Sequence, residues 1–155
     1  MFGAVKFSSP IRVFAIFAAL VYAAAAPGPE LGIVVASSTP AEAVLNVVLT
    51  GGAGALTGLQ FRIDCDSAPA KIGVAVGPSA GNAGKSLQSA AAGPASQRVL
   101  IIGLNQTGIA DGVVAVVRVS PSPVSGDGKP HVRLSGLAGT NLRGEAIVIR
   151  LEQPQ

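Results

Sequence analysis

The stretch Arg98–Ser120, RVLIIGLNQTGIADGVVAVVRVS, decides the class of fold. Two aliphatic runs, Val99–Leu104 and Val113–Val119, flank a polar turn at Asn105–Gly112. Most residues in these runs are β-branched, which favours extended strands over helix. Neither run alternates cleanly between apolar and polar residues. We therefore expect a central pair of strands, each buried on two faces.

Segments of similar character recur on both sides of this pair, separated by turn-forming residues. We expect further strands at Leu31–Ala36, Ala43–Thr50, Leu59–Cys65, Ile72–Val76, Val132–Leu137 and Glu145–Leu151. The glycine-rich Gly51–Gly58 is expected to form a loop. Ser79–Ala95 is expected to be a long loop with a short strand or a turn of helix near Lys85–Ala90. Eight or nine strands without a convincing helix predict an all-β, antiparallel sandwich.

The N-terminal residues have the organisation of a secretory signal peptide, expected as a helix ahead of the sandwich. Lys6 and Arg12 supply positive charge, Val13–Tyr22 is apolar, and Ala23–Ala26 offers small residues for cleavage. The apolar segment is short for a membrane span, and an uncleaved N-terminal anchor is the alternative.

The chain is accordingly divided into three parts, with cleavage placed after Ala25. Residues 1–25 are expected to be the signal peptide, 26–30 a spacer, and 31–152 a single domain with one core. The mature chain is expected to be secreted, to the periplasm or to the outside of the cell, without a membrane span. Loss of the signal also leaves nine basic and eight acidic residues. No basic cluster remains to follow a phosphate backbone, so no nucleic-acid partner is expected.

Aromatic side chains are nearly absent from the expected domain. Five of the six aromatic residues lie in the signal segment, and Phe61 is the only one that follows it. Carbohydrate and single-stranded nucleic-acid surfaces usually stack rings or bases on aromatic side chains, and this chain cannot build such a platform. The lone cysteine, Cys65, excludes an internal disulfide and is interpreted as a small buried hydrophobe.

The segment Leu59–Cys65 shows the clearest alternation in the chain. Its apolar members, Leu59, Phe61, Ile63 and Cys65, are predicted to face the core, with Phe61 as a core anchor. The intervening polar residues, Gln60, Arg62 and Asp64, are then directed outward onto one exposed sheet face.

Residues that could support catalysis or bind a metal do not form a recognisable set. His131 is the only histidine, and no G-x-S-x-G elbow accompanies it. Asp64 and Asp66 are interpreted as solvated acids at a strand end rather than as a glycosidase pair. Asp111 is interpreted as a turn former whose carboxylate accepts backbone N–H groups in an Asx-turn, with a role in binding as the alternative. We therefore expect no enzyme activity, no metal site and no cofactor.

Several segments resemble cohesin domains. Phe61–Asp66, followed by Lys71–Val76, resembles the family's strand with a terminal Tyr-Asp-Pro and the hydrophobic strand after it. Gly108–Ala115 and Gly144–Val148 are similar to later segments of the family. Cys65 stands where the family favours Tyr, and Ser67 replaces the Pro.

The resemblance implies a nine-stranded jelly-roll that binds a partner protein. In cellulose-degrading bacteria that partner is a dockerin, and the polar positions that help hold it correspond to Gly58 and Gln60. We expect a secreted module for protein–protein binding, either dockerin-type or at a cell surface, linked to polysaccharide degradation; direct polysaccharide binding is the alternative. The expected contact residues are Gln60, Arg62 and Asp64, led by Arg62. An ordinary solvated face at these residues, with contacts made instead by loops around Asn105–Asp111, is the alternative.

Overall fold

The computed structural model describes residues 28–66, 70–124 and 131–152. The expected signal peptide, residues 1–25, lies outside the described residues. The described elements are β1 (Glu30–Ser38), β2 (Ala43–Thr50), β3 (Leu56–Cys65), β4 (Lys71–Val76), α1 (Pro78–Asn82), β5 (Ser86–Gly93), β6 (Ser96–Ile102), β7 (Gly112–Ser120), β8 (Val132–Asn141), β9 (Ala146–Ile147) and β10 (Arg150–Leu151).

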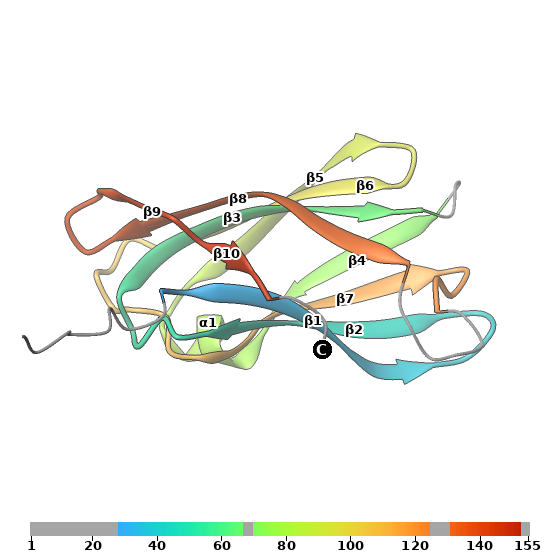
Figure 1. Cartoon of the computed structure of the whole chain (residues 1–155), viewed down its shortest axis with the longest axis horizontal. Coiled ribbons are helices and arrows are strands. Elements are labelled where there is room, and N and C mark those ends of the chain that lie inside the picture. The colour runs from blue at the N-terminus through green and yellow to red at the C-terminus, as the bar shows by residue number, and fades with distance from the viewer. Residues whose placement is uncertain (1–27, 67–69, 125–130, 153–155) are drawn as a thin grey trace, which may run out of the picture.

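The strands form two five-stranded sheets that lie face to face (Figure 1). One, called here the β2 sheet, has the order β10-β1-β2-β7-β4, and the other, the β3 sheet, has the order β5-β6-β3-β8-β9. Successive strands often change sheet, as in β2–β3–β4–β5 and β6–β7–β8. This arrangement confirms the predicted all-β sandwich. The pairings are antiparallel except for β1 with β10, which run parallel.

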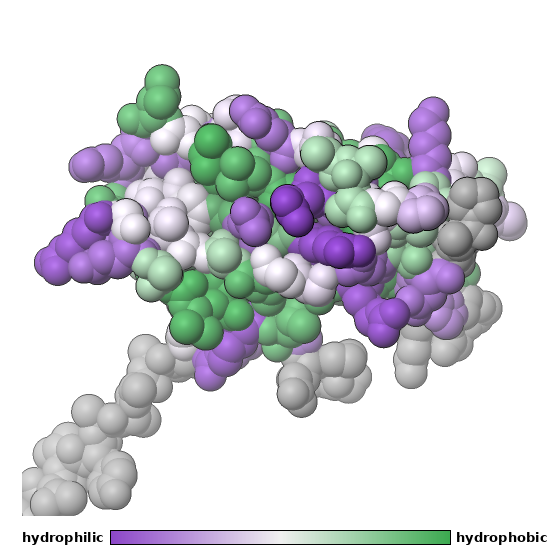
Figure 2. All heavy atoms as spheres, turned by 90° about the horizontal axis from the view of Figure 1, so that it is seen from above, coloured by the Kyte–Doolittle hydropathy of each residue, from purple (hydrophilic) through white to green (hydrophobic). Residues whose placement is uncertain are grey.

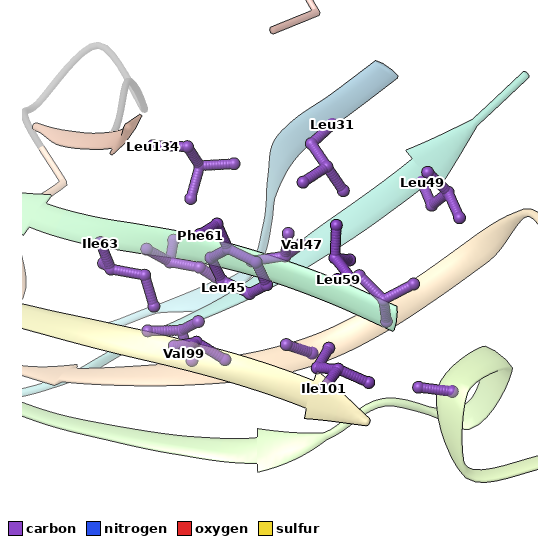
Figure 3. Close-up of a cluster of buried hydrophobic side chains, with 14 of the residues drawn as sticks. Leu31, Leu45, Val47, Leu49, Leu59, Phe61, Ile63, Val99, Ile101 and Leu134 are labelled. Carbon is purple, nitrogen blue, oxygen red and sulfur yellow. The ribbon is translucent and has the colours of Figure 1, made fainter. Parts of the chain in front are cut away.

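The core lies between the sheets and is aliphatic apart from Phe61. Alternate residues of β2 and β3 point inward, and Leu45 and Val47 of the first strand and Phe61 of the second are at most 1% exposed. Figure 3 shows these side chains gathered between the two sheets, together with Leu59, Ile63, Val99 and Ile101. The predicted inward alternation of Leu59–Cys65 and the predicted burial of Phe61 are confirmed.

The expectation that Val99–Leu104 and Val113–Val119 form a central pair, buried on both faces, is wrong. The first run lies in β6 of the β3 sheet and the second in β7 of the β2 sheet, so the turn between them crosses from one sheet to the other. In β6, Val99 is buried whereas Ile102 is 40% exposed, as expected for a sandwich strand with one solvated face. Aliphatic residues on the outer face hid this alternation in the sequence.

Three further expectations need correction. The predicted loop Gly51–Gly58 ends earlier, because β3 already begins at Leu56. The region Ser79–Ala95, expected to be mainly loop, holds most of the five-residue helix α1 and all of the eight-residue strand β5.

The predicted last strand, Glu145–Leu151, is two short strands in different sheets. β9 pairs with β8 in the β3 sheet, whereas β10 pairs with β1 in the β2 sheet. Ile149, between them, is buried as the chain crosses the end of the core.

Asp111 fixes the end of the sandwich where β2 leads into β3. Its carboxylate accepts hydrogen bonds from the backbone N–H groups of Gly51, Gly52 and Ala53, at 3.0, 2.8 and 3.1 Å. Gly51 adopts a φ of +67°, which glycine permits at little steric cost. The expectation that this carboxylate accepts backbone N–H groups is confirmed, but its donors lie about sixty residues away and not in the expected Asx-turn.

Truncation of Phe61 to Ala should remove the largest fully buried side chain of the core. We expect a loss of about 3–5 kcal/mol in the free energy of unfolding, because the removed ring leaves a cavity. Urea unfolding followed by circular dichroism measures this loss. Val148→Ala is the matched control, since Val148 is 83% exposed. Equal stability of the two variants would contradict the core assignment.

Replacing Asp111 by Ala should destabilise the loop at Gly51–Ala53. We expect a cost of about 1–2 kcal/mol, because three backbone donors lose a charged acceptor, although Gly51 and Ala53 are exposed and can bind water instead. Asp111→Asn should recover part of this loss, since two of the three hydrogen bonds reach a single oxygen, Oδ1. Thermal melts of both variants, with amide exchange at Gly52, test the prediction. Unchanged exchange in the Ala variant would show that this carboxylate does not hold the loop.

Candidate functional site

The outer face of the β3 sheet is a broad exposed surface that carries charged groups in its middle and at its ends (Figure 2). Figure 2 views the molecule onto this face and shows dark hydrophilic side chains beside green apolar surface. Gln60, Arg62 and Asp64 lie on it, because their neighbours in β3 point into the core. The structure therefore places all three predicted contact residues together on one face of the central strand.

Asp64 connects three adjacent strands through its two carboxylate oxygens. Oδ1 accepts hydrogen bonds from Nε of Arg62 and Oγ of Ser96 on β6, both at 2.6 Å, and Oδ2 accepts one from Oγ of Ser135 on β8 at 2.7 Å. Arg62 also donates from Nη2 to Oγ of Ser96 at 3.0 Å. The register of β3 with β6 and β8 brings Ser96 and Ser135 to this point. Neither serine was identified from the sequence, because its approach to Asp64 depends on the pairing of strands that are distant in the chain.

This network shifts the ionisation of Asp64. Burial acts to raise the pKa of the carboxyl, but hydrogen bonds from Ser96, Ser135 and Arg62, together with the charge of Arg62, outweigh burial and lower it. Asp64 therefore stays ionised and holds the Arg62 guanidinium in place. Arg62 is a fixed part of the face rather than a freely moving cation.

The remaining charges on the face are unevenly paired. Arg133 donates to Oδ1 of Asp66 at 2.6 Å, so the two acids Asp64 and Asp66 each hold a different arginine. Arg98 lies on β6 directly opposite Arg62 and is exposed. It makes no ion pair or side-chain hydrogen bond with any residue that the structure describes.

A shallow depression of about 160 Å³ lies beside Gln60 on the same face. Its lining includes Gly58, Leu100, Ala138 and Thr140, from three neighbouring strands. Gly58 leaves the space open, since a Cβ atom at this position would lie 2.6 Å from Oγ1 of Thr140. A second, wider depression of about 650 Å³ lies near Ile102 and Leu104, and the side chain of Leu104 is fully exposed there.

Lys85, at the edge of the wider depression, is the one buried charged residue of the described chain. Its Nζ donates to the backbone and side-chain oxygens of Asn105, at 3.0 and 2.7 Å, and Asn105 in turn donates to the carbonyl of Ala83. Burial lowers the pKa of Lys85. These contacts anchor the crossing between β6 and β7, which is a structural role.

The other reactive side chains do not gather into a site. Cys65 is buried at the end of β3, and His131 is exposed just before β8. Within residues 28–66, 70–124 and 131–152, no three His, Cys, Asp or Glu side chains come together as metal ligands. No helix in the same residues is long and apolar enough to cross a membrane.

The lowered pKa of Asp64 predicts a specific pH dependence of stability. A carboxyl whose pKa is lower in the folded than in the unfolded chain stabilises the fold above its unfolded pKa of about 4 and loses this effect as the pH falls through the folded value. Wild type should exceed Asp64→Asn in unfolding free energy at pH 6, and the gap should narrow below about pH 4. Urea unfolding of both proteins between pH 6 and 2.5 measures this difference in unfolding free energy.

Ser135→Ala serves as the second variant for this prediction. It keeps the carboxylate but removes one of its donors, so the pKa of Asp64 should rise toward its ordinary value in a carbon-detected NMR titration. A stability gap between wild type and Asp64→Asn that stays constant across the pH range would contradict the role of the network.

Comparison with known proteins identifies the fold. No protein-family model and no curated protein sequence matches the chain. Among solved structures, it is similar to the sixth cohesin of scaffoldin B from Acetivibrio cellulolyticus, solved with a mutant Cel5 dockerin; the TM-score is 0.63 at 15% identity, over 81% of this chain and 95% of that one.

Two further cohesins give the same result. The OlpC cohesin of Clostridium thermocellum, solved with the dockerin Doc435, matches with a TM-score of 0.60 at 13% identity, over 83% of this chain and 92% of that one. The seventh ScaB type I cohesin of Pseudobacteroides cellulosolvens matches with a TM-score of 0.55 at 12% identity, over 81% and 86%. The chain therefore has the fold of a cohesin domain.

Proposed function

We propose that this protein is a non-catalytic binding module that meets a dockerin-type protein with the outer face of its β3 sheet. The observation that carries the proposal is this broad exposed face, on a fold shared with cohesins that were solved in complex with dockerins. Its mixture of charged, neutral polar and small apolar side chains is typical of a non-obligate protein interface.

Gln60 lies at the centre of the proposed contact, with Arg62 and Asp64 beside it. Gln60 is exposed, and its neighbours in register are Leu100 of β6 and Ala138 of β8. Neither neighbour is larger than leucine, so a partner can approach the strand closely here. Arg62 and Asp64 add a rigid charged group whose orientation is set before binding, which reduces the entropy lost on association.

The proposed setting is outside the cytoplasm, in an assembly linked to polysaccharide degradation. The support is the signal-like sequence of residues 1–25 and the dockerin complexes of the similar folds. Direct binding of polysaccharide is not favoured. The single aromatic residue that follows the signal segment, Phe61, is fully buried, so it cannot stack on a sugar ring.

The proposal is tested with two matched substitutions in small exposed residues of opposite sheets. Ala138→Arg places a long side chain on the outer face of the β3 sheet, whereas Ala75→Arg does so on β4 of the β2 sheet. We expect Ala138→Arg to weaken dockerin binding by at least about tenfold, as obstruction of an interface centre does. Ala75→Arg should leave the affinity unchanged, and both melting temperatures should stay near that of wild type.

Binding is measured by calorimetry against a panel of dockerin modules that includes Cel5 of A. cellulolyticus and Doc435 of C. thermocellum. Loss of binding in Ala75→Arg alone would move the interface to the opposite sheet. Binding of the wild-type protein to insoluble cellulose or xylan, with no dockerin bound, would support the carbohydrate alternative instead.

A further inference from the structure

We propose that the partner's contact segment carries a carboxylate that pairs with Arg98 and, beside it, an aliphatic side chain that fills the depression at Gly58. This inference rests on the proposed function and names the chemistry of the partner. It gives the leading role to Arg98, which the sequence did not single out, rather than to Arg62.

The electrostatic part follows from which cations on the face are already neutralised. Arg62 is held by Asp64, and Arg133 by Asp66. Arg98 stands directly across from Arg62, and like charges in opposite positions on neighbouring strands repel each other. Both oxygens of Asp64 already accept hydrogen bonds from Arg62, Ser96 and Ser135. An acid from outside is therefore the complement that this part of the face lacks, and an arginine can bind it through two donors.

The apolar part follows from the depression beside Gln60. Its side-chain lining is mainly small or aliphatic, with Leu100 and Ala138 on the strands that flank β3. The backbone of Gly58 does not have a positive φ, so its conformation does not require glycine. What glycine contributes at this position is the absence of a side chain, which leaves the depression open. A volume of about 160 Å³ accommodates one aliphatic side chain of a partner. Burial of such a side chain would contribute the apolar centre that interfaces usually have.

The two features are spaced so that one segment can reach both. Arg98 and Leu100 are two residues apart on β6, which places them about 6.6 Å apart along the strand. Side chains three or four positions apart on a helix are separated by about 5–6 Å. One turn of a partner helix can therefore present the acid to Arg98 and the aliphatic residue to the depression.

The test is a display selection with a defined scaffold. A yeast-display library of the Doc435 dockerin from C. thermocellum, with exposed helix positions randomised, is selected on the wild-type protein and separately on Arg98→Glu. We expect Asp or Glu to be enriched on wild type, and Lys or Arg at the same position on Arg98→Glu. Clones from wild type should bind Arg98→Glu at least about tenfold more weakly, as expected for loss of a central arginine contact.

Matched controls separate the face from general effects of charge and size. Arg118→Glu makes the same charge change on β7 of the opposite sheet, and should leave the selected clones unaffected. Gly58→Val fills the depression and should weaken binding by clones with an aliphatic residue. Gly73→Val is its control, because a Cβ at Gly73 meets no atom within 4 Å. Thermal melts confirm that each variant is folded.

The outcomes distinguish the two proposals. One outcome would overturn the inference and leave the proposed function standing. In that outcome the selected clones fail to bind Ala138→Arg, carry no enriched Asp or Glu, and bind Arg98→Glu as well as wild type. If no selected clone is sensitive to Ala138→Arg, both fail. Sedimentation tests whether the free protein self-associates. Self-association that is lost in Ala138→Arg would mean that a second copy covers the face, and this would also overturn the inference.

Discussion

The alternation of Leu59–Cys65 in β3 is the constraint on which the rest of the structure depends. Burial of Leu59, Phe61 and Ile63 joins the centre of one sheet to the facing sheet, and Phe61 is the largest side chain in that contact. The chain has no disulfide among its described residues and few aromatics, so its stability rests on this aliphatic packing. Because the side-chain period of a strand is two, the same register directs Gln60, Arg62 and Asp64 outward. Core and candidate face are thus determined together.

The sequence predicts an element well where its pattern reflects its local surroundings. β2 matches the expectation at both ends, Ala43 and Thr50, because a proline-containing turn precedes it and a glycine pair follows it. β6 was misinterpreted for the opposite reason. Its outward residues Leu100 and Ile102 are aliphatic, so the apolar run concealed the period of two. An apolar residue in the sequence can lie in the core or line a depression on the surface, and residue type alone does not distinguish the two positions.

Features that depend on distant parts of the chain could not be predicted. The break of Glu145–Leu151 into two strands follows from its ends pairing with different sheets. The parallel contact of β10 with β1 is fixed by an ion pair of Arg150 with Glu30, at 3.0 Å, and by the backbone bond from Arg150 to Pro29. For the candidate site, the spacing of Arg62 and Asp64 placed them on one face, but the contributions of Ser96 and Ser135 require the register of three strands.

The charge of the outer face is a consequence of that same register. With Asp64 ionised, Arg62 is neutralised, whereas Arg98, directly across from it on β6, has no carboxylate partner among the described residues. Protonation of Asp64 would free a second guanidinium next to Arg98, and the repulsion between the two would then act on the pairing of β3 with β6. The hydrogen bonds that lower the pKa of Asp64 oppose this change. They therefore stabilise the sheet and, at the same time, keep Arg62 neutralised beside Arg98.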